Sequence, residues 1–397
     1  MNREDFPMLS KDIIYLDNGA TTFKPKCVID AITDYYSNYS ANAHRGDYEI
    51  SYRVDVAYEE SRNIIAKFIN ADRNDVIFTS GTTQGLNMIA TGYFKDVLNK
   101  DDEVLITLSE HASNVLPWFN LAALKGIKVN YIELDDKLHV TLDNVKKAIT
   151  DKTKVISLAL ITNVVGDVRP IKEIIEYAHE RDIKVVIDGA QGVSHMSVDV
   201  KYLDCDFLTF SGHKMCGPTG IGVLYGKHEL LEELKPVNLG GGMNDSFDNV
   251  DEVYYHELPT RLEAGTPNIA GAIGLGEAVK YISNIGMDKI HNYELELKKY
   301  LIDKLKKIDH IKIVNENGNS GIVAFNVDGV FAQDVAYYLN KYNICVRAGN
   351  HCAKILKHAI GIKNTIRVSL YFYNTYEELD TLVDLLSDKD RIVREMI

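Results

Sequence analysis

The sequence has few cysteines, and none is spaced as in a zinc or disulfide motif. Five cysteines in 397 residues are an odd number, and no two of them form a C-x-x-C pair. Neither a disulfide framework nor a four-ligand zinc site fits that pattern, so no metal site is expected. The five are Cys27, Cys205, Cys216, Cys345 and Cys352.

Positive charge and long apolar runs are also scarce. The net charge is −13, with 44 Lys and Arg against 57 Asp and Glu. Nucleic acids and anionic membranes bind basic faces, so neither is expected as the main partner. No apolar run approaches the length of a membrane span, and residues 1–12 lack the apolar core of a signal peptide. We therefore expect a reduced, cytoplasmic protein.

Strands and helices alternate through the first half of the chain. Such alternation is typical of a mostly parallel sheet with helices on both faces, and 46% hydrophobic residues suit a large core. The predicted strands are Ile13–Leu16, Val76–Thr79, Glu103–Thr107, Lys128–Leu134, Lys154–Ile161, Lys184–Ile187 and Asp206–Phe210.

The pattern changes after Gly220. Residues 269–307 are strongly helical, and from Ile311 onward short strands alternate with helices, which predicts an α+β second domain. A length of 397 residues also suits two domains. We expect a large α/β domain over residues 15–285. Residues 1–14 and 286–397 would then form a small domain.

Two side chains that could take part in catalysis follow predicted strands. Lys214 lies four residues beyond Phe210, and Asp188 directly follows Ile187. The carboxyl edge of a parallel sheet is where such folds bind ligands, and a desolvated lysine there can form a Schiff base. An aspartate at that edge can hold a protonated ring nitrogen. Alone, Lys214 would more often be a solvated loop lysine, and Asp188 could equally well be a turn or helix-capping residue.

Two further stretches follow predicted strands. Residues 80–85 place glycine and threonine at a helix start, which suits a phosphate, although the pattern is not a Walker A loop and Thr82 or Thr83 can be a simple N-cap. His111 offers a flat ring and a pKa near neutrality, or a structural role.

The predicted small domain contains a cysteine in an electropositive setting. Cys352 has Arg347, His351 and Lys354 as neighbours in a glycine-containing loop, as reactive thiolates do. An inert thiol is the alternative. Arg367, in a short strand, can clamp a carboxylate or form a surface ion pair.

These motifs occur together in one known family. Residues 211–222 (SGHKMCGPTGIG) and 188–191 (DGAQ) resemble the class V aminotransferase group of pyridoxal 5′-phosphate (PLP) enzymes. Residues 347–353 (RAGNHCA) and 263–268 (EAGTPN) make the chain similar to a group II, Suf-type cysteine desulfurase. The resemblance runs from Asp17 to about Asn374. It implies the PLP-dependent transferase fold type I, a homodimer and PLP as cofactor.

The resemblance also implies a role for each matching residue. PLP would be carried by Lys214, its ring held by Asp188, Gln191 and a stacked His111, and its phosphate bound by Thr83, Ser211, His213 and the partner subunit's Thr266. Arg367 and Asn163 would bind the substrate carboxylate, and Cys352 would be the nucleophile.

The implied reaction converts L-cysteine to L-alanine. Sulfur would be kept as a persulfide on Cys352 and passed to an acceptor protein of a Suf-type system for iron–sulfur cluster assembly. The segment Gly240–Tyr255 resembles the hairpin with which this group covers the partner subunit's site.

Four positions depart from the family pattern, and other activities stay open. Tyr48 and Leu160 stand where many relatives have histidine, while Cys216 and Asn350 replace a common tyrosine and histidine. These departures leave acceptor choice and pocket details undecided. A selenocysteine lyase, and a transaminase or epimerase with an incidental Cys352, are alternatives on the same scaffold. A non-catalytic scaffold is disfavoured because Lys214 and Asp188 are both present.

Overall fold

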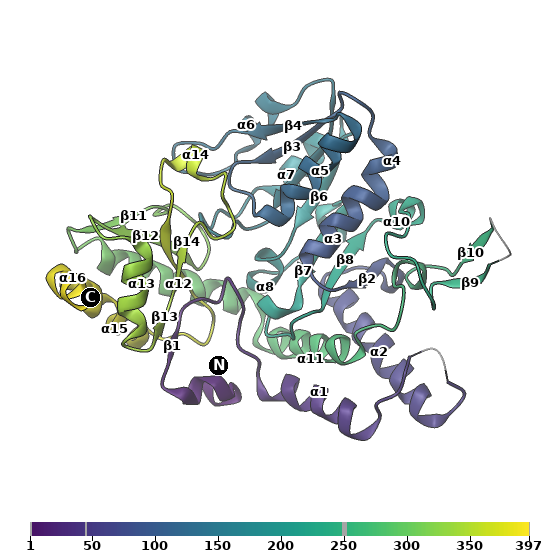
Figure 1. The fold of residues 1–397 in the computed structure, drawn as a ribbon, viewed down its shortest axis with the longest axis horizontal. Coiled ribbons are helices and arrows are strands. Elements are labelled where there is room, and N and C mark those ends of the chain that lie inside the picture. The colour runs from purple at the N-terminus through teal and green to yellow at the C-terminus, as the bar shows by residue number, and fades with distance from the viewer. Residues whose placement is uncertain (1, 44–45, 248–251, 397) are drawn as a thin grey trace.

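The computed structural model describes residues 2–43, 46–247 and 252–396. Its two largest sheets lie side by side (Figure 1), and each packs against apolar clusters of its own. We call the seven-stranded sheet with its helices the large domain. The four-stranded sheet with the C-terminal helices is the small domain. Among the described residues, no helix is long and apolar enough to cross a membrane.

The large sheet has the strand order β2-β8-β7-β6-β5-β3-β4, and only β8 runs antiparallel to its neighbours. The predicted mostly parallel α/β sheet is therefore confirmed. The strands are β2 (Val76–Thr79), β3 (Glu103–Thr107), β4 (Lys128–Ile132), β5 (Thr153–Ala159), β6 (Lys184–Asp188), β7 (Phe207–Ser211) and β8 (Gly222–Gly226).

Helices cover both faces of this sheet because apolar side chains leave each strand in alternate directions. In β3, Leu105 packs into the core cluster on one face, while Val104 and Ile106 pack into the cluster on the other. The helices are α1 (Lys26–Asn38), α2 (Glu49–Phe68), α3 (Thr82–Met88), α4 (Lys95–Val97), α5 (Leu116–Lys125), α6 (Leu142–Ala148), α7 (Ile171–His179), α8 (Gly192–His195), α9 (Val200–Leu203), α10 (His228–Glu233) and α11 (Ile269–Ile285).

The small domain packs helices against an antiparallel sheet of order β11-β12-β15-β14. A two-stranded ribbon of β1 (Ile14–Tyr15) and β13 (Ile344–Cys345) ties the start of the chain to this domain, so the predicted boundary at residue 15 falls inside β1. The remaining elements are β11 (Ile311–Ile313), β12 (Ile322–Val327), β14 (Arg347–Gly349), β15 (Thr365–Ser369), α12 (Met287–Leu305), α13 (Ala332–Asn340), α14 (Lys357–Ile360), α15 (Tyr376–Ser387) and α16 (Lys389–Glu395).

The segment predicted to reach a partner subunit forms a projecting hairpin (Figure 1). Strands β9 (Asn244–Phe247) and β10 (Val253–Tyr255) pair antiparallel and expose Phe247, Tyr254 and Tyr255. Residues 248–251 of the predicted segment lie outside the described residues.

Candidate active site

A cavity of about 180 Å³ lies at the carboxyl edge of β5, β6 and β7. This is the edge at which parallel sheets bind ligands, and the last residue of each of these three strands lines the cavity. The lining comprises Gly19, Ala20, Thr82, Thr83, His111, Ser113, Ala159, Ile161, Asn163, Asp188, Ala190, Gln191, Ser211, His213, Lys214, Arg347 and Arg367.

Lys214 enters this cavity from a 3₁₀ turn, Gly212–Lys214, that directly follows β7. Burial lowers the pKa of its ammonium to about 8. The negative charge of Asp188 opposes this shift, while the guanidinium of Arg367 adds to it. A substantial fraction of the amine is therefore neutral near physiological pH, as a Schiff-base nucleophile requires.

Asp188 ends β6 and faces the same cavity as Lys214. Burial raises the pKa of its carboxyl to about 6, while a hydrogen bond that the backbone N–H of Ala190 donates at 2.9 Å opposes the shift. A buried carboxylate is stabilised by a cationic partner, so the position suits a protonated ring nitrogen. Gln191, on the same turn, donates from Nε2 to the carbonyl oxygen of Gly19 at 2.8 Å.

Hydroxyl groups gather where β2 turns into α3. The backbone N–H of Thr82 donates to Ser211 Oγ at 2.9 Å, and the Thr83 and Ser113 hydroxyl oxygens are 2.8 Å apart. Gly81 precedes them with φ +147°, a conformation that favours glycine. Ser113 was missed from the sequence, although it lies two residues after His111 in the same loop.

Two histidines at this cavity are held neutral. Burial lowers the pKa of His111 to about 4, and nearby Lys214 adds to the effect. The Nδ1 atom of His111 accepts a hydrogen bond from the backbone N–H of Ser113 at 3.1 Å, which places the imidazole proton on Nε2. Burial, with Lys214 and Lys24, likewise lowers the pKa of His213 to about 4.

A buried ion pair supports the loop that carries His111. Arg169 and Glu110 have fully buried side chains and are joined by a salt bridge. Arg169 Nη2 also donates to the hydroxyls of Thr107 and Ser109, both at 2.8 Å, while Glu110 accepts the backbone N–H of Ala159 at 2.9 Å. The pair thus connects the ends of β3 and β5 behind the cavity wall. Sequence reasoning missed it, because neither residue belongs to a recognised motif.

Two arginines face the cavity from adjacent strands of the small domain. Arg367 in β15 and Arg347 in β14 are directly opposite each other in the antiparallel register. Like charges in that arrangement repel, so an anion between them is favoured. Arg367 donates from Nη1 to the backbone oxygen of Asn163 at 3.0 Å and from Nη2 to Asp17 at 2.6 Å.

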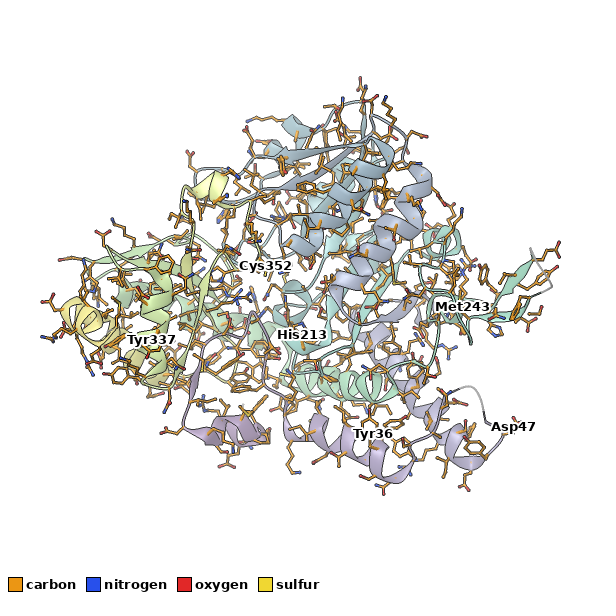
Figure 2. All side chains as sticks on the ribbon, viewed as in Figure 1. Tyr36, Asp47, His213, Met243, Tyr337 and Cys352 are labelled. Carbon is orange, nitrogen blue, oxygen red and sulfur yellow. The ribbon has the colours of Figure 1, made fainter. Side chains whose placement is uncertain are left out.

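Cys352 lies in the loop after β14. Figure 2 shows it near the junction of the two domains, where His213 of the large domain also lies. It is half-buried, and Arg347 Nη2 is 3.6 Å from its Sγ. Its backbone oxygen accepts from Ala112 at 2.8 Å, and Asn163 Nδ2 donates to the oxygen of His351 at 2.7 Å. The cysteine loop is therefore fastened to the large domain beside His111. Thr266 does not line the cavity within this chain.

Comparison with known proteins identifies the family. The aminotransferase class-V model matches residues 14–382. The chain belongs to this family. A probable cysteine desulfurase from Halalkalibacterium halodurans is 42% identical over 383 residues, which cover 95% of this chain and 94% of the relative.

Two solved structures are similar in fold over almost their whole length. The apo cysteine desulfurase from Thermococcus onnurineus superposes with a TM-score of 0.93 at 38% identity, covering 97% of this chain and 96% of the other. The cysteine desulfurase CsdA (S-sulfonic acid) from Escherichia coli gives 0.92 at 36% identity, covering 100% and 98%. The PLP-dependent fold type I predicted from the sequence is thereby confirmed.

Pyridoxal 5′-phosphate is the cofactor of this class V enzyme, and the cavity fits it. Three buried polar atoms of the lining have no hydrogen-bond partner in the described structure: Gln191 Oε1, Asn163 Oδ1 and Arg367 Nε. Buried polar atoms without partners are costly, so this wall is suited to a polar ligand. A lysine amine, a buried carboxylate and a group of hydroxyls match the aldehyde, pyridine nitrogen and phosphate of PLP.

Proposed function

We propose that this chain is a PLP-dependent cysteine desulfurase, which converts L-cysteine to L-alanine and holds the sulfur as a persulfide on Cys352. The observation that carries the proposal is one cavity shared by Lys214, Asp188 and the Arg347–Arg367 pair, with Arg347 also contacting the Cys352 thiol. A transaminase needs a lysine, an aspartate and an arginine in these places, but it does not need the cysteine.

The cofactor and substrate are held by different parts of the cavity. Lys214 would hold PLP at its aldehyde carbon, Asp188 at its pyridine nitrogen and Gln191 at its ring oxygen, and His111 would lie beside the ring. Thr83, Ser211 and His213 would bind its phosphate. When bound, PLP acts as an electron sink for the amino acid. Arg367 and Asn163 hold the substrate carboxylate, so that Cα faces Lys214.

Two residues of the chain do the bond-making work. The neutral amine of Lys214 takes the proton from Cα, which its lowered pKa of about 8 allows near neutrality. The Cys352 thiolate attacks the substrate sulfur. A new S–S bond forms, the Cβ–S bond breaks, and its electron pair goes to carbon, which is protonated to give alanine. Arg347 Nη2 lies 3.6 Å from the Cys352 sulfur and faces the cavity.

Sulfur leaves Cys352 for an acceptor protein, and the chain works as a homodimer. A Suf-type role in iron–sulfur cluster assembly is proposed from the resemblance of the residue 347–354 loop. The homodimer is supported by the position of Thr266, which lies away from the cavity of its own chain, and by the exposed aromatic residues of the β9–β10 hairpin.

Substitution of the nucleophile tests the activity. Cys352→Ala should lower alanine formation from L-cysteine at least a hundredfold, with dithiothreitol as the final acceptor, and keep the visible band of bound PLP. Cys345→Ala is the matched control, because Cys345 lies in β13 of the same domain and, unlike Cys352, has no described hydrogen bond with Arg347. Unchanged alanine formation by Cys352→Ala would contradict the persulfide route.

A further inference from the structure

The sequence around Cys352 has an unusual charge balance for this chain. Residues 335–376 contain no Asp or Glu but six Lys or Arg, although the whole chain has a net charge of −13. Arg347 and Arg367 of this segment face the cavity. The charges that remain near the cysteine are lysines, and the described structure places them at the surface.

Three lysines surround one small hollow beside the cysteine loop. Lys354, Lys357 and Lys363 are exposed and line this hollow together with Gly349 and Asn350. We call these three lysines the Lys patch. None of them has an ion-pair partner within the described residues. The hollow measures about 20 Å³, room for about one water molecule, so it is too small for an organic ligand.

The loop that carries the Lys patch is anchored by buried apolar side chains. Leu356, between two of its lysines, packs with Val164 and Ala353 in an apolar cluster that Leu138 of the large domain also touches. The loop of Leu138 contributes acidic groups, but Asp135 accepts the backbone N–H groups of Lys137 and His139, at 2.9 and 2.8 Å. Asp136 is exposed and forms no ion pair with the described lysines. Within residues 335–376, the charged side chains beside Cys352 are all positive.

We propose that the Lys patch binds an acidic face of the protein that accepts sulfur from Cys352. Lys354 is two residues from the sulfur donor, so a partner whose thiol reaches Cys352 also covers the patch. Unpaired surface lysines attract an acidic partner over about a Debye length and raise the association rate at low salt. This inference rests on the proposed desulfurase function, because it assigns the partner of the same cysteine.

A charge swap tests the proposal with synthetic peptides as the probe. One peptide has its single cysteine flanked by Asp and Glu, and the other has Lys in the same places. Persulfide-loaded full-length protein is mixed with each, and the transfer rate is measured at low and high salt. We expect the acidic peptide to be favoured about tenfold at low salt, with the preference vanishing at high salt.

A Lys patch variant separates docking from the reactivity of the peptides. Flanking charges change the reactivity of the peptide thiol, so we compare the ratio of the two peptides' transfer rates between the variant and the unmodified protein. Substituting Lys354→Glu, Lys357→Glu and Lys363→Glu together should reverse that ratio. The control carries Lys289→Glu, Lys299→Glu and Lys307→Glu, three exposed lysines on or just after α12 with the same total charge change. Its ratio should equal that of the unmodified chain.

Failure of this inference and of the proposed function give different results. Loss of persulfide formation, or of alanine formation with dithiothreitol, in the unmodified chain would overturn the desulfurase function. Normal persulfide formation with a rate ratio that the Lys patch variant leaves unchanged would overturn only the acidic-partner inference.

Discussion

At the scale of single residues, cofactor binding depends on the protonation of Lys214. Its pKa of about 8 is below the ordinary value because the amine is buried. A base with a lowered pKa is neutral at lower pH than usual, so its nucleophilic form increases as pH rises and is nearly complete above about pH 9.

Cofactor uptake tests this pKa. We expect the rate of covalent PLP binding to cofactor-free protein to increase about tenfold per pH unit below pH 8 and to level off above it. The visible band of the bound cofactor measures the rate, and Lys214→Ala should give no such band. A rate that continues to increase to pH 10 would show that the lysine has an ordinary pKa.

At the scale of elements, the Glu110–Arg169 pair joins β3 and β5 behind His111. Removing one partner of a buried ion pair leaves the other charge without compensation, which costs about 3–5 kcal/mol. Replacing both removes the uncompensated charge of the pair, but the buried Asp167 carboxylate, 3.7 Å from Arg169 Nε, still loses its cation. The pair therefore fixes the His111 loop, and its effect on stability and on the cofactor can be measured separately.

A double-mutant cycle tests the pair. Arg169→Met should lower the free energy of unfolding by about 3–5 kcal/mol and shift the visible band of bound PLP, since the His111 loop loses its support. Adding Glu110→Leu should recover part of the stability but not the band, because Asp167 stays without a cation and the Ala159 N–H loses its acceptor. Equal destabilisation by the single and the double variants would contradict the coupling of the two residues.

Some strands and helices could be predicted from the sequence, and others could not. Strands β2 to β7 and the residues that follow them were predictable, because each is a short apolar run with polar residues at its end. The antiparallel β8 was missed, since glycines at both ends hide its pattern. The predicted helical run of 269–307 breaks at Gly286, where φ is +96°. Pairing across the chain, as between Arg169 and Glu110, has no local signal.

At the scale of the whole molecule, the single chain lacks one group that the site is predicted to use. Thr266 does not line the cavity, whereas Thr83, Ser211 and His213 do. We expect light scattering to give twice the chain mass of 44.6 kDa, and Thr266→Val to weaken PLP binding without changing that mass. A monomeric form of the protein that binds PLP as tightly as the dimer, measured at the same protein concentration, would contradict a site shared between two subunits.

The location of the transferred sulfur decides whether Cys352 is the nucleophile. The protein is incubated with L-cysteine that carries a heavy sulfur isotope, quenched without reductant and digested for mass spectrometry. We expect a gain of one heavy sulfur atom on the peptide that contains Cys352, with one alanine formed for each sulfur bound. Sulfur on another cysteine, or alanine formed while Cys352 gains none, would contradict it.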